Sequence, residues 1–125
     1  MKKKVLIVED ERSIVTALAA GFDRQEVEVL TALDGEEGLK VALKERPHLI
    51  LLDLVMPIMD GITMLHKLRE DDWGKDVKVI ILTNLDDQKK VADAVQHGVF
   101  DYFIKANWNI KEIIKKVQTE LSYIN

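Results

Sequence analysis

Apolar residues are gathered in short runs along the chain, and polar, often charged segments separate them. The runs are rich in β-branched and aliphatic residues, and they lie at residues 5–8, 27–32, 49–52, 77–82 and 99–104. Residues 5–8 and 49–52 contain no polar position at all. A parallel strand that is covered on both faces requires such a continuous apolar sequence, because side chains pointing in both directions are buried. The pattern therefore predicts five parallel strands with helices between them.

The segments between the runs show the three- and four-residue spacing of amphipathic helices. One apolar stripe comprises Ile14, Val15, Leu18, Ala19 and Phe22, and another comprises Ile110, Ile113, Ile114, Val117, Leu121 and Ile124. Shorter helices are expected at about residues 34–45, 61–70 and 86–97. The chain would then alternate strand and helix five times.

Start and stop signals agree with these helices. Asp34 is followed by Glu37, and Asn109 by Glu112, at the spacing of a capping box, while Gly98 suits the end of a helix.

An alternation of strands and helices with right-handed crossovers gives a doubly wound α/β fold, a three-layer sandwich for which two strand orders are common. The periodicity alone leaves both orders open.

Composition narrows the class of protein. The 125 residues, 47% of them hydrophobic, fit a single domain spanning residues 1–125. The absence of cysteine excludes a disulfide framework or a thiolate zinc site. A net charge of -4 argues against direct binding of nucleic acid. Residues 5–8 are too short for the apolar region of a signal peptide, and no segment approaches a membrane span, so we expect a soluble cytoplasmic protein with no membrane partner.

Reactive polar residues end four of the apolar runs. They are Glu9 and Asp10, then Asp53, Thr83 and Lys105. The carboxyl ends of parallel strands share one edge of a sheet, where open α/β sheets form their ligand crevice, so these side chains are expected to converge. The turn after the first strand lacks the glycines of a dinucleotide site and carries anions instead, which disfavours nucleotide binding there.

The order and spacing of these elements resemble a bacterial response-regulator receiver domain of the two-component, chemotaxis-regulator-like kind. The resemblance rests on Leu-Ile-Val-Glu-Asp at residues 6–10, Leu-Leu-Asp-Leu-Val-Met-Pro-Ile-Met-Asp-Gly at 51–61, Thr83, and Asp-Tyr-Phe-Ile-Lys at 101–105. It spans the whole chain. It implies a flavodoxin-like five-stranded parallel sheet in the order 2-1-3-4-5.

The resemblance also implies the chemistry of the site. A carboxylate can attack a phosphoryl group and hold it as a mixed anhydride, and Asp53 is the expected nucleophile and site of phosphorylation. Carboxylates with waters suit Mg²⁺, the expected cofactor. The similar proteins imply that Asp10 and Asp53 bind the metal directly, with the backbone carbonyl of Val55, and that Glu9 acts through water. Lys105 would neutralise a phosphoryl oxygen.

The same resemblance implies that two residues form the conformational switch that responds to phosphorylation. Thr83 matches the residue whose hydroxyl turns toward the phosphoryl group, and Tyr102 matches the aromatic residue that rotates behind it. The helix at about 86–97, the fifth strand and the last helix would then form the surface that a downstream protein, an effector domain or a second copy of the chain recognises. The expected phosphodonor is a sensor histidine kinase or a phosphotransfer protein. The chain would catalyse only its own phosphorylation and dephosphorylation.

The chain departs from the family pattern beside the site. Ala106 stands where the similar proteins commonly have a proline in a cis peptide, so we expect a trans bond after Lys105. Asn84 is bulkier than the usual small residue. Val55 and Leu85 are apolar at positions that influence hydrolysis in the family, which predicts slow loss of the phosphoryl group.

Other functions remain open. A phosphorylation-independent pseudo-receiver, acting as a docking module, is the main alternative, and the departures at Asn84 and Ala106 keep it open. A phosphotransfer enzyme acting on small molecules is disfavoured, because Asp53 is not soon followed by a second acid. His48, His66 and His97 are scattered in the sequence and lack ligand spacing, so packing or surface roles are expected rather than metal binding.

Overall fold

The computed structural model describes residues 2–83, 88–99, 101–105 and 109–124. Within them, parallel strands form one sheet in the order β2-β1-β3-β4-β5. The strands are β1 (Lys3–Val8), β2 (Val27–Ala32), β3 (Leu49–Asp53), β4 (Lys78–Thr83) and β5 (Asp101–Ile104). The helices are α1 (Arg12–Ala20), α2 (Gly35–Glu45), α3 (Gly61–Arg69), α4 (Gln88–Gln96) and α5 (Ile110–Ser122). The predicted flavodoxin-like α/β sandwich and its strand order are confirmed.

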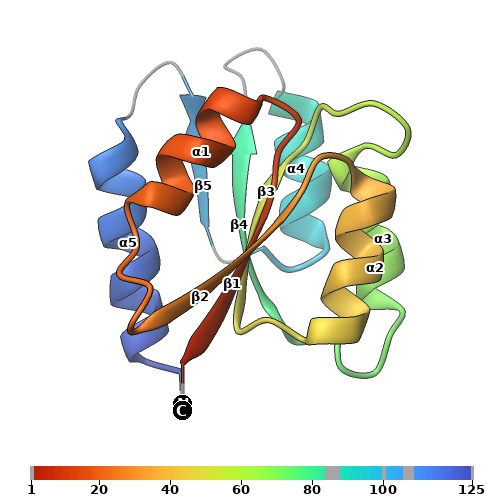
Figure 1. Cartoon of the computed structure of the whole chain (residues 1–125). Helices are drawn as coiled ribbons and strands as arrows, with labels where there is room; N and C mark the ends of the chain where they lie inside the picture. The colour runs from red at the N-terminus through yellow and green to blue at the C-terminus, as the bar shows by residue number, and fades with distance from the viewer. Residues whose placement is uncertain (1, 84–87, 100, 106–108, 125) are drawn as a thin grey trace.

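Two helical layers cover the sheet. Helices α1 and α5 lie on one face, and α2, α3 and α4 lie on the other (Figure 1). Successive strand residues point to opposite faces, so Ile7 packs toward α1 and α5 while its neighbour Leu6 packs toward the other layer. Both side chains are fully buried. Burial of one such side chain stabilises the fold by roughly 1.5–3 kcal/mol, which explains why residues 5–8 and 49–52 of the central strands are all apolar.

The observed helix caps follow the sequence signals. The side chain of Asp34 accepts a hydrogen bond from the Glu37 amide at 2.8 Å, and Asn109 accepts one from the Glu112 amide at 3.0 Å. Gly98 ends the turn after α4 with a φ of 78°, a left-handed conformation that suits glycine. The predicted caps are therefore confirmed.

Some predicted boundaries were wrong by one or two residues. The fifth strand begins at Asp101 rather than at residue 99, because Val99 follows the left-handed turn at Gly98 and packs against the core beneath α4. Helix α1 ends at Ala20, although Phe22 beyond it is buried in the core as the apolar stripe predicted. The apolar spacing indicates which residues are buried. A buried residue just beyond the end of a helix can therefore continue the spacing although it is not helical.

Among the described residues, no helix is both long enough and apolar enough to cross a membrane.

Candidate functional site

The strand register brings the polar strand ends to one edge of the sheet. Val8 pairs with Leu52, so the next residues of the two strands, Glu9 and Asp53, lie at the same level. The next pairing joins Asp53 to Leu82 of β4. Backbone pairing alone therefore places Glu9 and Asp53 at the same edge of the sheet.

The same register continues toward β5. Thr83 at the end of β4 pairs with Ile104, and Lys105 follows directly. Thr83 is buried, with 1% of its surface exposed. The hydroxyl-bearing residue and the lysine thus belong to the same edge of the sheet as the carboxylates, as predicted.

Three carboxylates form the centre of this site. Oxygen atoms of Glu9, Asp10 and Asp53 lie within 4.8 Å of one another. Glu9 and Asp53 are buried, whereas Asp10 is exposed to solvent. Carboxylate oxygens are hard ligands of the kind that Mg²⁺ prefers. The three carboxylates supply an all-oxygen donor set with Asp10 on its solvent side, so the residues present fit the metal that the sequence predicted.

Lys105 supplies the positive charge of the cluster. Its Nζ lies 2.6 Å from Oε1 of Glu9 and 3.3 Å from Oδ2 of Asp53. Glu11 is more distant, at 3.7 Å from the same nitrogen. The Lys105 side chain is only 12% exposed, so water screens these ion pairs less than it would screen pairs on the surface. One ammonium thus faces two buried carboxylates.

Burial and charge perturb the acids of the cluster. Loss of solvent raises the pKa of Glu9 from 4.5 to about 8, and the nearby Asp53 carboxylate adds to this rise, while Lys105 opposes it. Burial also raises the pKa of Asp53, against the opposing effects of its hydrogen bonds and of Lys105. Burial works to lower the pKa of Lys105, but the two carboxylates outweigh it and raise that pKa. Burial therefore favours the protonated form of each acid relative to an exposed carboxylate.

Backbone groups orient the two buried carboxylates. The Val55 amide donates to Oδ1 of Asp53 at 3.3 Å, and the Glu11 amide donates to Oε2 of Glu9 at 3.2 Å. Oε1 of Glu9 is buried and has no hydrogen-bond partner within the described part of the chain, although it forms an ion pair with the Lys105 ammonium. An acceptor of this kind is suited to an additional cation or metal-bound water.

Gly61 sets the return of the loop after Asp53. A Cβ atom at this glycine would lie 2.2 Å from the backbone oxygen of Asp53 and 2.8 Å from Cα of Leu54. The Gly61 amide donates to the Leu54 carbonyl at 3.0 Å. This close approach requires a residue without a side chain.

The predicted site residues differ in how far they converge. Glu9, Asp10, Asp53 and Lys105 come together, and Thr83 ends the neighbouring strand. Tyr102 lies outside this cluster on β5 with 45% of its surface exposed. The side chain of Val55 is exposed, and its carbonyl remains a predicted ligand. Asn84, Leu85 and Ala106 lie outside the described residues.

Glu11 was missed in the prediction of the site. Its amide supports Glu9, and its carboxylate is within 4.0 Å of the Lys105 ammonium. The signal was present as a third acid directly after Glu9 and Asp10. It was not used because strand alternation predicts the strand-end residues but not the path of the turn that follows.

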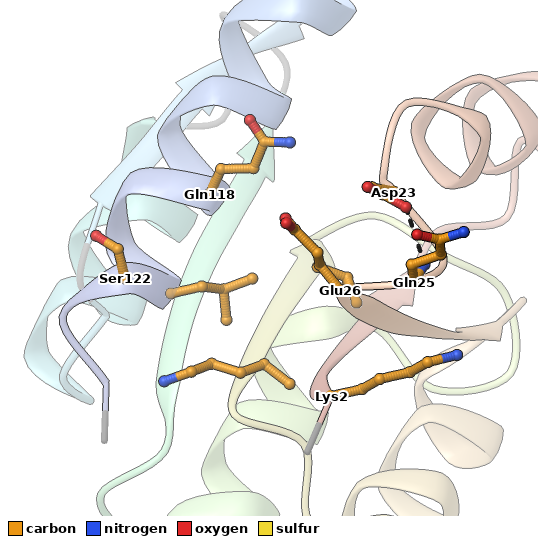
Figure 2. Close-up of a pocket in the computed structure, with 9 residues that line it drawn as sticks. Lys2, Asp23, Gln25, Glu26, Gln118 and Ser122 are labelled. Atoms are coloured by element: carbon orange, nitrogen blue, oxygen red, sulfur yellow. Dashed lines mark hydrogen bonds between the residues drawn. The ribbon is translucent and has the colours of Figure 1, made fainter.

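A groove of about 570 Å³ lies away from this site, between the turn before β2 and the C-terminal half of α5 (Figure 2). Lys2, Asp23, Gln25, Glu26, Gln118 and Ser122 line it together with Lys3, Val27 and Leu121. These residues are at the amino-terminal edge of the strands, whereas open α/β sheets bind ligands beyond the carboxyl ends. None of the predicted site residues lines this groove.

Comparisons with known proteins show the family to which the chain belongs. The family described as "Response regulator receiver domain" matches residues 5–118. The alkaline phosphatase synthesis transcriptional regulatory protein PhoP of Bacillus subtilis is 37% identical over 122 residues, covering 93% of this chain and 50% of PhoP. The chain belongs to the response-regulator receiver domain family, and it spans half the length of that relative.

Solved structures show the same relationship. The receiver domain of the response regulator AraT from Geobacillus stearothermophilus is 34% identical, with a TM-score of 0.81 and coverage of 98% of this chain and 97% of that one. A CheX-CheY complex from Borrelia burgdorferi contains a chain that is 29% identical, with a TM-score of 0.81 and coverage of 95% and 89%. The fold and the family assignment thus have independent support.

Proposed function

We propose that the chain accepts a phosphoryl group on Asp53 from the phosphohistidine of a sensor histidine kinase or a phosphotransfer protein, and that this changes its affinity for a partner. The observation that carries the proposal is the convergence of Asp53, two further carboxylates and the Lys105 ammonium at the carboxyl edge of the sheet. A buried nucleophilic carboxylate beside a fixed cation is the arrangement that phosphoryl transfer needs.

The chain's own residues would divide the chemical step between them. An oxygen of Asp53 attacks phosphorus, one P–O bond forms, the P–N bond breaks, and the imidazole leaves with the electron pair. Lys105 neutralises charge on a phosphoryl oxygen, and the Val55 amide holds the other oxygen of Asp53 in place. The chain then acts only on itself, and it is not an enzyme with an independent substrate.

Glu9, Asp10 and Asp53 would hold Mg²⁺, with the Val55 carbonyl as a further ligand and Glu9 acting through water. When bound, this cation offsets the repulsion between the incoming phosphoryl group and the carboxylates. The donor set is all oxygen, and the buried Oε1 of Glu9 has acceptor capacity to spare. The CheX-CheY complex from Borrelia burgdorferi also contains BeF3 and Mg+2, which supports metal binding by a protein of this fold.

The signal would travel through Thr83 and Tyr102 to the surface of α4, β5 and α5. Phosphorylation adds charge and acceptors beside Thr83, and it shifts the conformational population as far as those contacts differ between states. Tyr102 is exposed on β5 and so has room to change position. A downstream protein, an effector domain or a second copy of the chain would bind there in the cytoplasm. PhoP, a longer relative, is named as a transcriptional regulator, which supports an output outside the receiver itself.

The test is intact-mass spectrometry after incubation with a small phosphodonor, with and without Mg²⁺. We expect a single phosphoryl adduct that depends on Mg²⁺ and is lost in Asp53→Asn. Asp72→Asn serves as the matched control, because Asp72 is an exposed loop residue outside the cluster. It should keep the adduct.

An adduct that persists in Asp53→Asn would contradict the assignment of the nucleophile. If the parent forms no adduct, a phosphorylated histidine kinase replaces the small donor. Failure with that donor as well would refute phosphoryl acceptance and favour a pseudo-receiver that docks its partner without modification. The presence of all the site residues argues for phosphoryl acceptance and against the pseudo-receiver.

A further inference from the structure

Two histidines that are far apart in the sequence meet between α3 and α4. The rings of His66 and His97 stack with their centroids 3.8 Å apart and their planes inclined by 23°. Asp93 lies one helical turn before His97, and its Oδ1 is 3.3 Å from Nε2 of His66 and 3.2 Å from Nδ1 of His97. One carboxylate oxygen therefore faces both imidazoles. The two histidines are scattered in the sequence, but the fold brings them into contact.

Two of the distances in this cluster are close to those between neighbouring ligand atoms of a metal ion. Tetrahedral zinc has bonds of about 2.0–2.1 Å to nitrogen and oxygen, which places neighbouring ligand atoms about 3.3–3.4 Å apart. The two distances to Asp93 Oδ1 fall close to that edge length. A ligand atom from each of the three residues lies within 4.8 Å of the others. Two imidazoles and one carboxylate are a donor set that suits zinc and similar divalent transition metals.

We propose that His66, Asp93 and His97 form a binding site for a divalent transition-metal ion of the zinc class, which links α3 to the C-terminal end of α4. The three side chains supply two nitrogens and one oxygen, and the fourth position is open to water. All three are between 33% and 42% exposed, so an ion has direct access from solvent.

Binding requires a defined rearrangement. The nearly parallel rings direct their nitrogen lone pairs side by side, so at least one ring turns out of the stack to meet a shared ion. The hydrogen bond between Nδ1 of His97 and the Asp93 carbonyl, at 2.9 Å, is exchanged for a metal–nitrogen bond. The partial exposure of the rings gives them space for this movement.

Arg69 fixes the backbone on which the cluster is built. Its guanidinium donates to the carbonyls of His97 at 2.8 Å and Gly98 at 2.5 Å, and also to those of Gly74 and Val77. The end of α4 is therefore tied to the end of α3 without the metal. The ion has to move only side chains, which lowers the conformational cost of assembling the site.

The test is calorimetric titration with Zn²⁺ in excess Mg²⁺, which occupies the carboxylate cluster of the other site. We expect one Zn²⁺ per chain in the parent. Either His66→Gln or His97→Gln should weaken binding at least about tenfold, since loss even of groups behind a metal ligand costs about 10–100-fold. His48→Gln is the matched control, because it removes the third histidine of the chain and should leave the affinity unchanged.

A second measurement identifies the ligand atoms. Nitrogen-15 spectra of the imidazoles should show shifts at His66 and His97 on addition of Zn²⁺, and none at His48. The proposal is overturned if the parent binds no Zn²⁺ under these conditions. It is also overturned if binding survives in both histidine variants, or if binding is lost in Asp53→Asn, which would place the ion at the carboxylate cluster instead.

Discussion

Lys105 holds together two buried carboxylates, so its removal is a direct test of how the site is stabilised. The variant Lys105→Met keeps an unbranched side chain of similar length and removes only the ammonium. In the parent this group lies 2.6 Å from Glu9 and 3.3 Å from Asp53. Its loss leaves the acids facing each other with no compensating cation among the contacts described.

The size of the effect follows from these distances. At an effective dielectric constant of about 20, each contact is worth roughly 5–6 kcal/mol before the cost of desolvation. Removing one partner of a buried ion pair typically costs about 3–5 kcal/mol of unfolding free energy. The site is open to water beside Asp10, and Glu9 can take up a proton, so we expect a loss of about 2–3 kcal/mol without metal near pH 8.

Urea unfolding in the presence of a chelator measures this loss. Lys40→Met is the matched control, since Lys40 forms an exposed pair with Glu36 at 3.5 Å, a contact worth about 0.3–0.5 kcal/mol. Mg²⁺ should stabilise Lys105→Met more than the parent, because a bound cation replaces the missing charge. A loss no larger than that of Lys40→Met would refute the view that Lys105 compensates the buried carboxylates.

Three further predictions concern the same edge of the sheet. The pKa of Glu9 is raised to about 8, so the folded state keeps a proton that the unfolded state releases above about pH 4.5. The metal-free protein should therefore lose stability as the pH rises between these two values. In urea unfolding at several pH values, the stability of Glu9→Gln should depend less on pH than that of the parent. An unchanged slope would contradict the shift. Gly61→Ala should cost about 1–3 kcal/mol in the same assay, since its Cβ would meet the Asp53 backbone; an unaltered midpoint would contradict that close contact. Val55→Asn should shorten the lifetime of the phosphorylated protein severalfold in a mass-spectrometric decay series, and equal or slower decay would show that Val55 does not hinder hydrolysis.

The sheet and the centre of the site were predictable because both depend on strand ends. In a parallel sheet, residues that follow paired strands must share an edge, so Glu9, Asp53 and Lys105 could be placed together from apolar runs alone. Their ionisation could not be predicted in the same way. The raised pKa of Glu9 depends on the distances to Asp53 and Lys105 and on complete burial, which strand periodicity does not specify.

Contacts between helices were less accessible to sequence reasoning. His66 lies on α3, and Asp93 and His97 belong to α4 and the turn after it, in segments separated by a whole strand. Their meeting depends on how the two helices pack side by side on the sheet, which the apolar stripes do not determine. Only the spacing of Asp93 and His97, one helical turn apart, was visible in the sequence, and without the third residue it indicates no site.

At the carboxyl edge of the sheet the chain buries acidic side chains, whereas its core is apolar. A buried acid such as Glu9 costs free energy unless it is neutralised, and here it shares one ammonium with Asp53. Replacing Glu9 and Asp53 with apolar residues would remove that cost, so the arrangement is not explained by stability. It is explained if the edge is built to bind cations and a phosphoryl group, because the unbalanced negative charge then favours the metal-bound state over the metal-free state. Burial raises the pKa of Glu9 and the Asp53 carboxylate adds to that rise, and under the proposed function a bound divalent cation would offset the same costs.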